Sequence, residues 1–146
     1  MSRFAQRLRS AVGKGGVLYL SPMSGSYSGG STVNVAIRMT SGSTLVNTVQ
    51  ANLTYPTAQL QFGSISTVGS PFTTTIQSNG GSGSVQLGVG ILAGSTFGDQ
   101  LVGVITFTAT AAGAATVTFN AGSGIARTAD AVDICTQKRG AAYTIT

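Results

Sequence analysis

The feature that most constrains this chain is an alternation of apolar and polar residues that recurs in many short stretches of its 146 residues. In TVNVAIRMT at 32–40 every second residue is apolar, and TVQANLTY at 48–55 repeats the pattern until Pro56 ends it. Successive side chains of an extended strand point to opposite faces, so this period places one face of each stretch against a core. The alternation therefore predicts strands with one buried face.

Clusters rich in Gly, Ser, Pro and Asn separate these stretches, which is the pattern of a sandwich or a barrel. The chain is long enough for one domain with its own core. We predict a single all-β sandwich over residues 17–146 with about nine strands. They span 17–20, 32–40, 48–55, 60–65, 72–76, 84–91, 100–110, 114–119 and 142–146.

Glycine positions refine this prediction. SNGGSG at 78–83 is the expected connection of a hairpin, and TATAAGAAT at 108–116 is expected to form strand, turn and strand around its glycine. Single glycines inside strands predict bulges or close contacts between sheets, here at Gly88, Gly90 and Gly103.

The composition excludes most catalytic chemistry. There is no His, no Trp and no Glu, and the only side-chain carboxylates are Asp99, Asp130 and Asp133. Without imidazole there is no Ser-His-Asp or Cys-His arrangement and no histidine ligand for a metal. A pair of catalytic carboxyl groups could come only from these three aspartates. We therefore predict a protein that is not an enzyme and needs no cofactor.

Two local features each allow a functional interpretation and a purely structural one. Asp130 and Asp133 could contribute to a weak Ca²⁺ site, but such a site needs six to eight oxygen ligands, so we expect an ordinary solvated loop. Cys135 is the only cysteine and cannot form an internal disulfide. No basic residue or His lies beside it to activate the thiol, so we expect a half-buried hydrophobe near the end of a strand.

The positive charge is concentrated at the N-terminus. The formal net charge is +5, yet four of the eight cations lie in the first fourteen residues, and the remaining four face three aspartates. In this arm, residues 1–16, apolar residues recur every fourth position beside the cations, which predicts a short amphipathic helix. At about three turns it is too short to be stable alone, so we expect it to dock onto something. The predicted assembly arm consists of Arg3, Phe4, Arg7, Leu8, Arg9, Val12 and Lys14.

Other roles for the arm fit the sequence less well. Its charges continue to Arg9 and no apolar run follows, which argues against a conventional export signal. Four cations could contact phosphates, but the rest of the chain has no second basic cluster and no base-reading motif, so nucleic-acid binding is disfavoured. Attachment to a membrane surface is disfavoured similarly.

Two stretches resemble a known family, the cohesin-like domains. The first, VNTVQANLTYPTAQLQFGSI at 46–65, is similar to the family's strand ending in Tyr, turn with Pro, Leu-x-Phe and strand ending in Ile. The second, GDQLVGVITFTATAAGAATVTF at 98–119, is similar to its Leu-x-x-Ile-x-Phe strand, Ala/Gly turn and next strand. The resemblance implies a nine-stranded jelly-roll sandwich, related in shape to some carbohydrate-binding modules. It also implies protein recognition, because cohesins bind calcium-loaded dockerin modules through one sheet face.

A candidate recognition face follows from the strand at 48–55. Its polar residues, spaced at about 7 Å along one side, are Thr48, Gln50, Asn52 and Thr54. Many family members have Asn and Asp on the dockerin-facing strand, whereas this chain has Thr48 and Gln50 there. The simpler interpretation is an ordinary solvated face. Asn52-Leu53-Thr54 is also a glycosylation sequon, which matters only if the chain meets that machinery.

These observations lead to two functional hypotheses. The first is a structural or adhesive module on a virion surface, such as a capsid decoration protein held to the shell by its arm. The second is a cohesin-type receptor module at the cell surface, or otherwise outside the cell, that binds a dockerin-like protein or a glycan. The partner would be a capsid or scaffold protein, and the module could also form a homo-oligomer. The aromatic residues that could stack against a glycan are Tyr19, Tyr27, Phe72 and Phe97.

Overall fold

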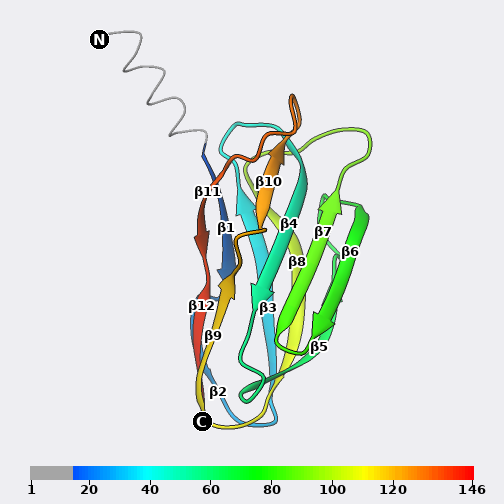
Figure 1. Ribbon diagram of the computed structural model, residues 1–146. Coiled ribbons are helices and arrows are strands. Elements are labelled where there is room, and N and C mark those ends of the chain that lie inside the picture. The colour runs from blue at the N-terminus through cyan, green and yellow to red at the C-terminus, as the bar shows by residue number, and fades with distance from the viewer. Residues whose placement is uncertain (1–14) are drawn as a thin grey trace, which may run out of the picture.

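The protein is a sandwich of two β-sheets, seen in a computed structural model that describes residues 15–146 (Figure 1). The predicted assembly arm, Arg3 to Lys14, lies outside the described residues. Residues 15–146 contain no helix, and hence none that could cross a membrane. The strands are β1 (Gly16–Ser21), β2 (Ser24–Tyr27), β3 (Thr32–Thr40), β4 (Val46–Thr54), β5 (Leu60–Ser66), β6 (Thr74–Gly81), β7 (Ser84–Gly90), β8 (Asp99–Ala109), β9 (Gly113–Phe119), β10 (Gly124–Arg127), β11 (Cys135–Arg139) and β12 (Ala141–Ile145).

The first sheet has the strand order β11-β1-β3-β8-β5, and the second has β2-β12-β9-β4-β7-β6 with β10 beside β4. Neighbouring strands are antiparallel except for two pairs, β1 with β11 and β2 with β12. Among the passages of the chain from the first sheet to the second are those between β1 and β2 and between β11 and β12. These two crossings join the sheets along one side of the sandwich (Figure 1).

The core fills the space between the sheets, as the alternation predicts. On β3 the apolar residues at positions 33, 35, 37 and 39 are fully buried. Phe107 of β8 lies at the centre of an aromatic group, with its ring centroid 4.9 Å from that of Tyr55 and 6.5 Å from that of Phe62. Burial of this apolar surface is the main force that holds the two sheets together.

The structure confirms the all-β sandwich but contains twelve strands instead of about nine. The three additional strands, β2, β10 and β11, have the sequences SGSY, GIAR and CTQKR. None of them has the buried alternation of strands such as β3, β4 and β12, so each is defined by the neighbour with which it pairs.

The hairpin between β6 and β7 is tighter than we predicted. Both strands extend into the glycine-rich segment, which leaves only Ser82 and Gly83 in the turn. Their φ angles are 55° and 89°, the left-handed conformation that two-residue hairpins of type I′ require. Phe72 is also not a surface platform, because it is 1% exposed and packs into the core just before β6.

Of the strand glycines, Gly103 makes the predicted close contact between the sheets, whereas the close contact at Gly88 lies within one sheet. A Cβ atom on Gly103 would lie 2.7 Å from Leu87 Cδ2 of the opposite sheet, and one on Gly88 would lie 2.5 Å from Gln50 Oε1. A register shift also interrupts the pairing of β3 with β8 near Gly103. Gly103 therefore allows the sheets to approach, while Gly88 leaves space on the outer surface.

Candidate interaction face

The predicted recognition face lies on the outer side of β4, inside the second sheet. Val49, Ala51 and Leu53 are fully buried, so the residues between them point outward. Thr48, Gln50 and Asn52 are half-buried and Thr54 is exposed. The strand is flanked by β7 on one side and by β10 and β9 on the other, which makes these side chains the middle of a continuous surface.

A chain of carboxamide side chains crosses this surface. Gln50 Nε2 donates to Asn52 Oδ1 at 2.7 Å and to Gln77 Oε1 on β6 at 3.0 Å. Gln77 Nε2 in turn donates to Gln86 Oε1 on β7 at 3.2 Å. The register places Gly88 between Gln50 and Gln77, so its missing side chain lets the two amides meet across β7. We call Asn52, Gln50, Gln77 and Gln86 the amide chain.

The loop after β9 is hydrogen-bonded to the end of the recognition face that contains Asn52 and Thr54. Ser123 Oγ accepts a hydrogen bond from Asn52 N at 2.9 Å and donates to Asn52 O at 3.0 Å, so one buried hydroxyl fixes the loop to β4. Thr54 Oγ1 donates to Asn120 Oδ1 at 2.9 Å. A shallow pocket of about 260 Å³ lies beside this junction, between Thr48, Gln50 and Asp133.

Exposed apolar residues border the amide chain at one end of the sheet. An antiparallel bridge between Val46 and Thr96 sets Leu45 beside Phe97, and these residues are 50% and 56% exposed. Ile76 of β6 is 65% exposed, and its Cδ1 lies 3.5 Å from the Cβ position of Gly90 on β7. We call Leu45, Ile76 and Phe97 the apolar end. Exposed apolar side chains near hydrogen-bonding groups are typical of a surface that meets another protein.

The amide chain and the apolar end contain no charged side chain. One ion pair lies at the loop after β10, where Arg127 donates to both carboxylate oxygens of Asp130, at 2.9 and 2.7 Å. These hydrogen bonds hold the pKa of Asp130 below its usual value. The face therefore offers hydrogen bonds and apolar surface, and long-range charge contributes little to its recognition properties.

The two aspartates considered as calcium ligands are occupied by protein donors. Asp130 is bound by Arg127, and Asp133 Oδ1 accepts hydrogen bonds from Ile125 N at 3.0 Å and Cys135 N at 2.9 Å. Within residues 15–146, no three His, Cys, Asp or Glu side chains come together as a metal site would require. Asp133 thus joins the start of β11 to β10. Cys135 itself is half-buried, and burial raises the pKa of its thiol.

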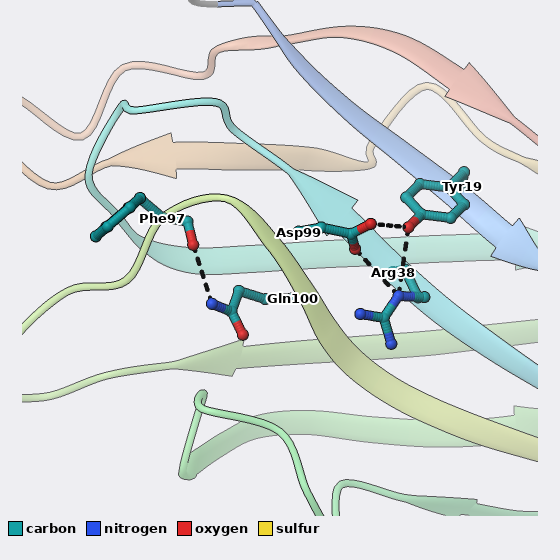
Figure 2. A network of polar contacts seen from close by, with 5 residues as sticks. All are labelled: Tyr19, Arg38, Phe97, Asp99 and Gln100. Carbon is teal, nitrogen blue, oxygen red and sulfur yellow. Dashed lines mark hydrogen bonds and ion pairs between the residues drawn. The ribbon is translucent and has the colours of Figure 1, made fainter.

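The opposite sheet carries a polar network that the sequence analysis did not single out (Figure 2). Tyr19 of β1 donates its hydroxyl proton to Asp99 Oδ2 at 2.5 Å. Arg38 Nε of β3 donates to Asp99 Oδ1 at 3.1 Å and to the Tyr19 hydroxyl oxygen at 3.3 Å. Partial burial and the hydrogen bond to Asp99 raise the pKa of Tyr19. Cross-strand register brings these residues together from three strands, which a local pattern does not reveal.

The four aromatic residues considered as a glycan platform do not gather on one surface. Tyr19 belongs to the network of the first sheet, and Phe97 belongs to the apolar end. Tyr27 packs edge-on against Tyr143, with ring centroids 5.6 Å apart, and Phe72 is in the core. None of these four aromatic residues therefore forms a stacking platform for a glycan on the amide chain.

Comparison with known proteins identifies the fold. No protein-family model matches the sequence, and no curated protein does. Solved structures do match, and they are cohesins. One from Clostridium acetobutylicum superimposes with a TM-score of 0.74 at 17% identity, covering 92% of each chain. A non-cellulosomal cohesin from the archaeon Archaeoglobus fulgidus gives a TM-score of 0.69 at 15% identity, covering 90% of this chain and 91% of that one.

A third similar structure contains a partner. It is the third ScaC cohesin of Acetivibrio cellulolyticus in complex with the ScaB dockerin, with a TM-score of 0.64 and 15% identity, covering 89% of this chain and 96% of that one. At these identities the similarity establishes the architecture only. The protein has the cohesin-like jelly-roll fold, as the two sequence stretches indicated.

Proposed function

We propose that this protein is a non-enzymatic docking module of the cohesin type. The amide chain and the apolar end bind a dockerin-like protein domain, and the assembly lies outside the cell or on its surface. The observation that carries the proposal is the amide chain, in which Gln50, Gln77 and Gln86 bridge three strands around Gly88. Their mutual hydrogen bonds hold the side chains in place before a partner arrives, which lowers the entropy cost of binding.

Two further observations support this assignment. The apolar end supplies the exposed side chains that usually contribute most of the energy of an interface. The amide chain lies on the strands β4, β6 and β7 instead of on loops, so it suits recognition with little change of shape. The solved structures of the same fold are cohesins, and this favours the receptor hypothesis over the capsid hypothesis, which has no support among them.

The test is a binding measurement against a panel of dockerin domains with and without Ca²⁺, using isothermal titration calorimetry. Gln77→Ala removes the middle of the amide chain, and Phe97→Ser removes apolar contact. Each should weaken binding at least about tenfold, as at a hot-spot position. Gln61→Ala is the matched control, because Gln61 is an exposed glutamine on β5 of the other sheet; it should leave the affinity within about twofold.

The same experiment at several salt concentrations checks the chemistry of the face. Since the face is uncharged, the dissociation constant should change little between low and high salt. Binding to no dockerin of a broad panel, or binding that Gln77→Ala and Phe97→Ser leave intact, would overturn the proposal. The docking role of the assembly arm and the formation of a homo-oligomer stay predictions. Analytical ultracentrifugation of the full chain would measure its oligomeric state directly.

A further inference from the structure

The outer surface of the first sheet presents a tyrosine with one arginine on each side of it. The register pairs Tyr19 of β1 with Arg38 of β3 on one side and with Arg139 of β11 on the other. All three side chains therefore leave the sheet on the same face and in one row. We call Arg139, Tyr19 and Arg38 the basic row. It lies on the sheet opposite to the amide chain.

Arg38 is held with its outer edge free. Its Nε atom is engaged by Asp99 and by the Tyr19 hydroxyl, which fixes the plane of the guanidinium. Within residues 15–146 neither terminal nitrogen of Arg38 has a hydrogen-bond partner, and Figure 2 shows both pointing away from Asp99. The side chain is 33% exposed. A guanidinium with a free two-nitrogen edge is suited to a carboxylate, whose two oxygens accept two parallel hydrogen bonds.

A pocket of about 370 Å³ adjoins the row beside Tyr19. Val17 and Met23 give it an apolar lining, and Thr40, Arg139 and the Asp99 carboxylate contribute polar groups. Arg139 uses one terminal nitrogen to donate to Gln137 Oε1 at 2.7 Å, which orients it along β11. Tyr19 and Arg139 thus line a partly apolar hollow, and Arg38 lies on the other side of Tyr19 from Arg139.

The charges on this surface favour an anion. Arg38 and Arg139 face a single acid, Asp99, whose two oxygens are engaged by Arg38 and Tyr19. Lys138, next in the chain to Arg139, donates instead to Ala121 O, so it is directed away from the row. The row therefore has an excess of one positive charge beside an aromatic ring, whereas the amide chain has no charge.

We infer that the basic row is a second binding site, for a carboxylate-bearing sugar such as a hexuronate unit of an acidic polysaccharide. The sugar carboxylate is held by the free edge of Arg38, the apolar side of the pyranose ring lies against Tyr19, and its hydroxyls reach Thr40 and Gln137. A hollow with an aromatic ring, apolar groups and a few convergent polar groups suits a saccharide better than an acidic peptide, which needs only the charge. This inference does not depend on the dockerin proposal.

The experiment titrates the full chain with a tetragalacturonate, with a neutral hexose tetrasaccharide and with a peptide of four glutamates, following backbone amide shifts by NMR. The uronate should shift residues around Tyr19 and Arg38, while the neutral sugar and the peptide should bind at least about tenfold more weakly. Arg38→Lys keeps the charge but loses the two-nitrogen edge, and should weaken uronate binding about tenfold.

Two variants separate the site from unspecific charge. Arg139→Gln should weaken uronate binding severalfold, and Gln86→Ala on the opposite sheet should have no effect; both positions are exposed, so folding is retained. Equal binding of the peptide, no uronate binding at millimolar concentration, or full binding by Arg38→Lys would each overturn the inference. Arg38→Lys and Arg139→Gln should leave dockerin binding unchanged, whereas Gln86→Ala, in the amide chain, should weaken it, which keeps the two proposals distinguishable.

Discussion

The hydroxyl of Tyr143 on β12 is hydrogen-bonded to the connection between β1 and β2. Tyr143 is 2% exposed, and its hydroxyl donates to Pro22 O at 2.6 Å. Burial, and secondarily the nearby Tyr27, raise the pKa of Tyr143 well above its ordinary value. The folded protein therefore disfavours the ionised form that the unfolded chain tolerates. This group stabilises the fold fully below the ordinary tyrosine pKa of about 10 and loses that contribution as the pH rises above it.

Replacing Tyr143 with Phe tests this at two pH values. At pH 7 the free energy of unfolding should fall by about 1 kcal/mol, because the hydrogen bond to Pro22 O is lost. Above pH 10 the wild type should lose stability more steeply than Tyr143→Phe; a smaller slope remains in the variant because the pKa of Tyr19 is raised too. Urea unfolding followed by fluorescence at several pH values measures both effects, and identical slopes would show that Tyr143 is not the titrating group.

At the same scale, the sequence predicts which side chains point outward but not which of them meet. Alternation alone places Gln50 on the outer side of β4, and the structure agrees. The bond from Gln50 to Gln77 joins residues 27 positions apart. It depends on the registers of β4 with β7 and of β7 with β6, which the packing of the whole sandwich decides. The Tyr19, Arg38 and Asp99 network was missed for the same reason.

At the scale of single elements, the connection from β11 to β12 passes too close to β9 for a side chain at its glycine. Gly140 lies between these strands, and a Cβ atom there would come 2.3 Å from Val117 O of β9. Because the obstructing atom belongs to the backbone of a paired strand, it cannot move without breaking the pairing of β12 with β9.

Gly140→Ala is therefore expected to lower the free energy of unfolding by more than about 2 kcal/mol. Gly88→Ala is the matched comparison, since its Cβ would meet only the flexible end of Gln50. That variant should retain nearly full stability while displacing the amide chain and weakening partner binding. Thermal unfolding followed by circular dichroism ranks the two, and equal stability would contradict the steric argument.

Strand prediction succeeded where burial is regular. The bounds of β3 agree with the prediction, because every second residue faces the core along its whole length. The strands β10 and β11 are only four and five residues long and contain one and no fully buried residue respectively, so their sequences are too short to show a period. They become strands because β4 and β1 offer free edges with which they pair.

At the scale of the whole molecule, the strands and the core that the structure describes lie in residues 16–146. Deleting residues 1–14 should therefore leave the circular dichroism spectrum and the thermal midpoint unchanged. If the assembly arm is the anchor, the full-length protein should co-sediment with its native large assembly and the deletion variant should not. Loss of folding in the deletion variant would instead show that Phe4, Leu8 and Val12 belong to the domain core.

The parallel pairs at the two ends of the chain determine how the molecule would respond to a mechanical load. The described chain begins at one end of the sandwich and finishes at the other (Figure 1). The first two strands run beside the last two, β1 along β11 and β2 along β12, in the same direction. Tension applied between the termini would therefore slide these neighbours along each other. Several backbone hydrogen bonds in each pair would have to break at once instead of one after another, so the domain is built to transmit force from one end to the other without unravelling.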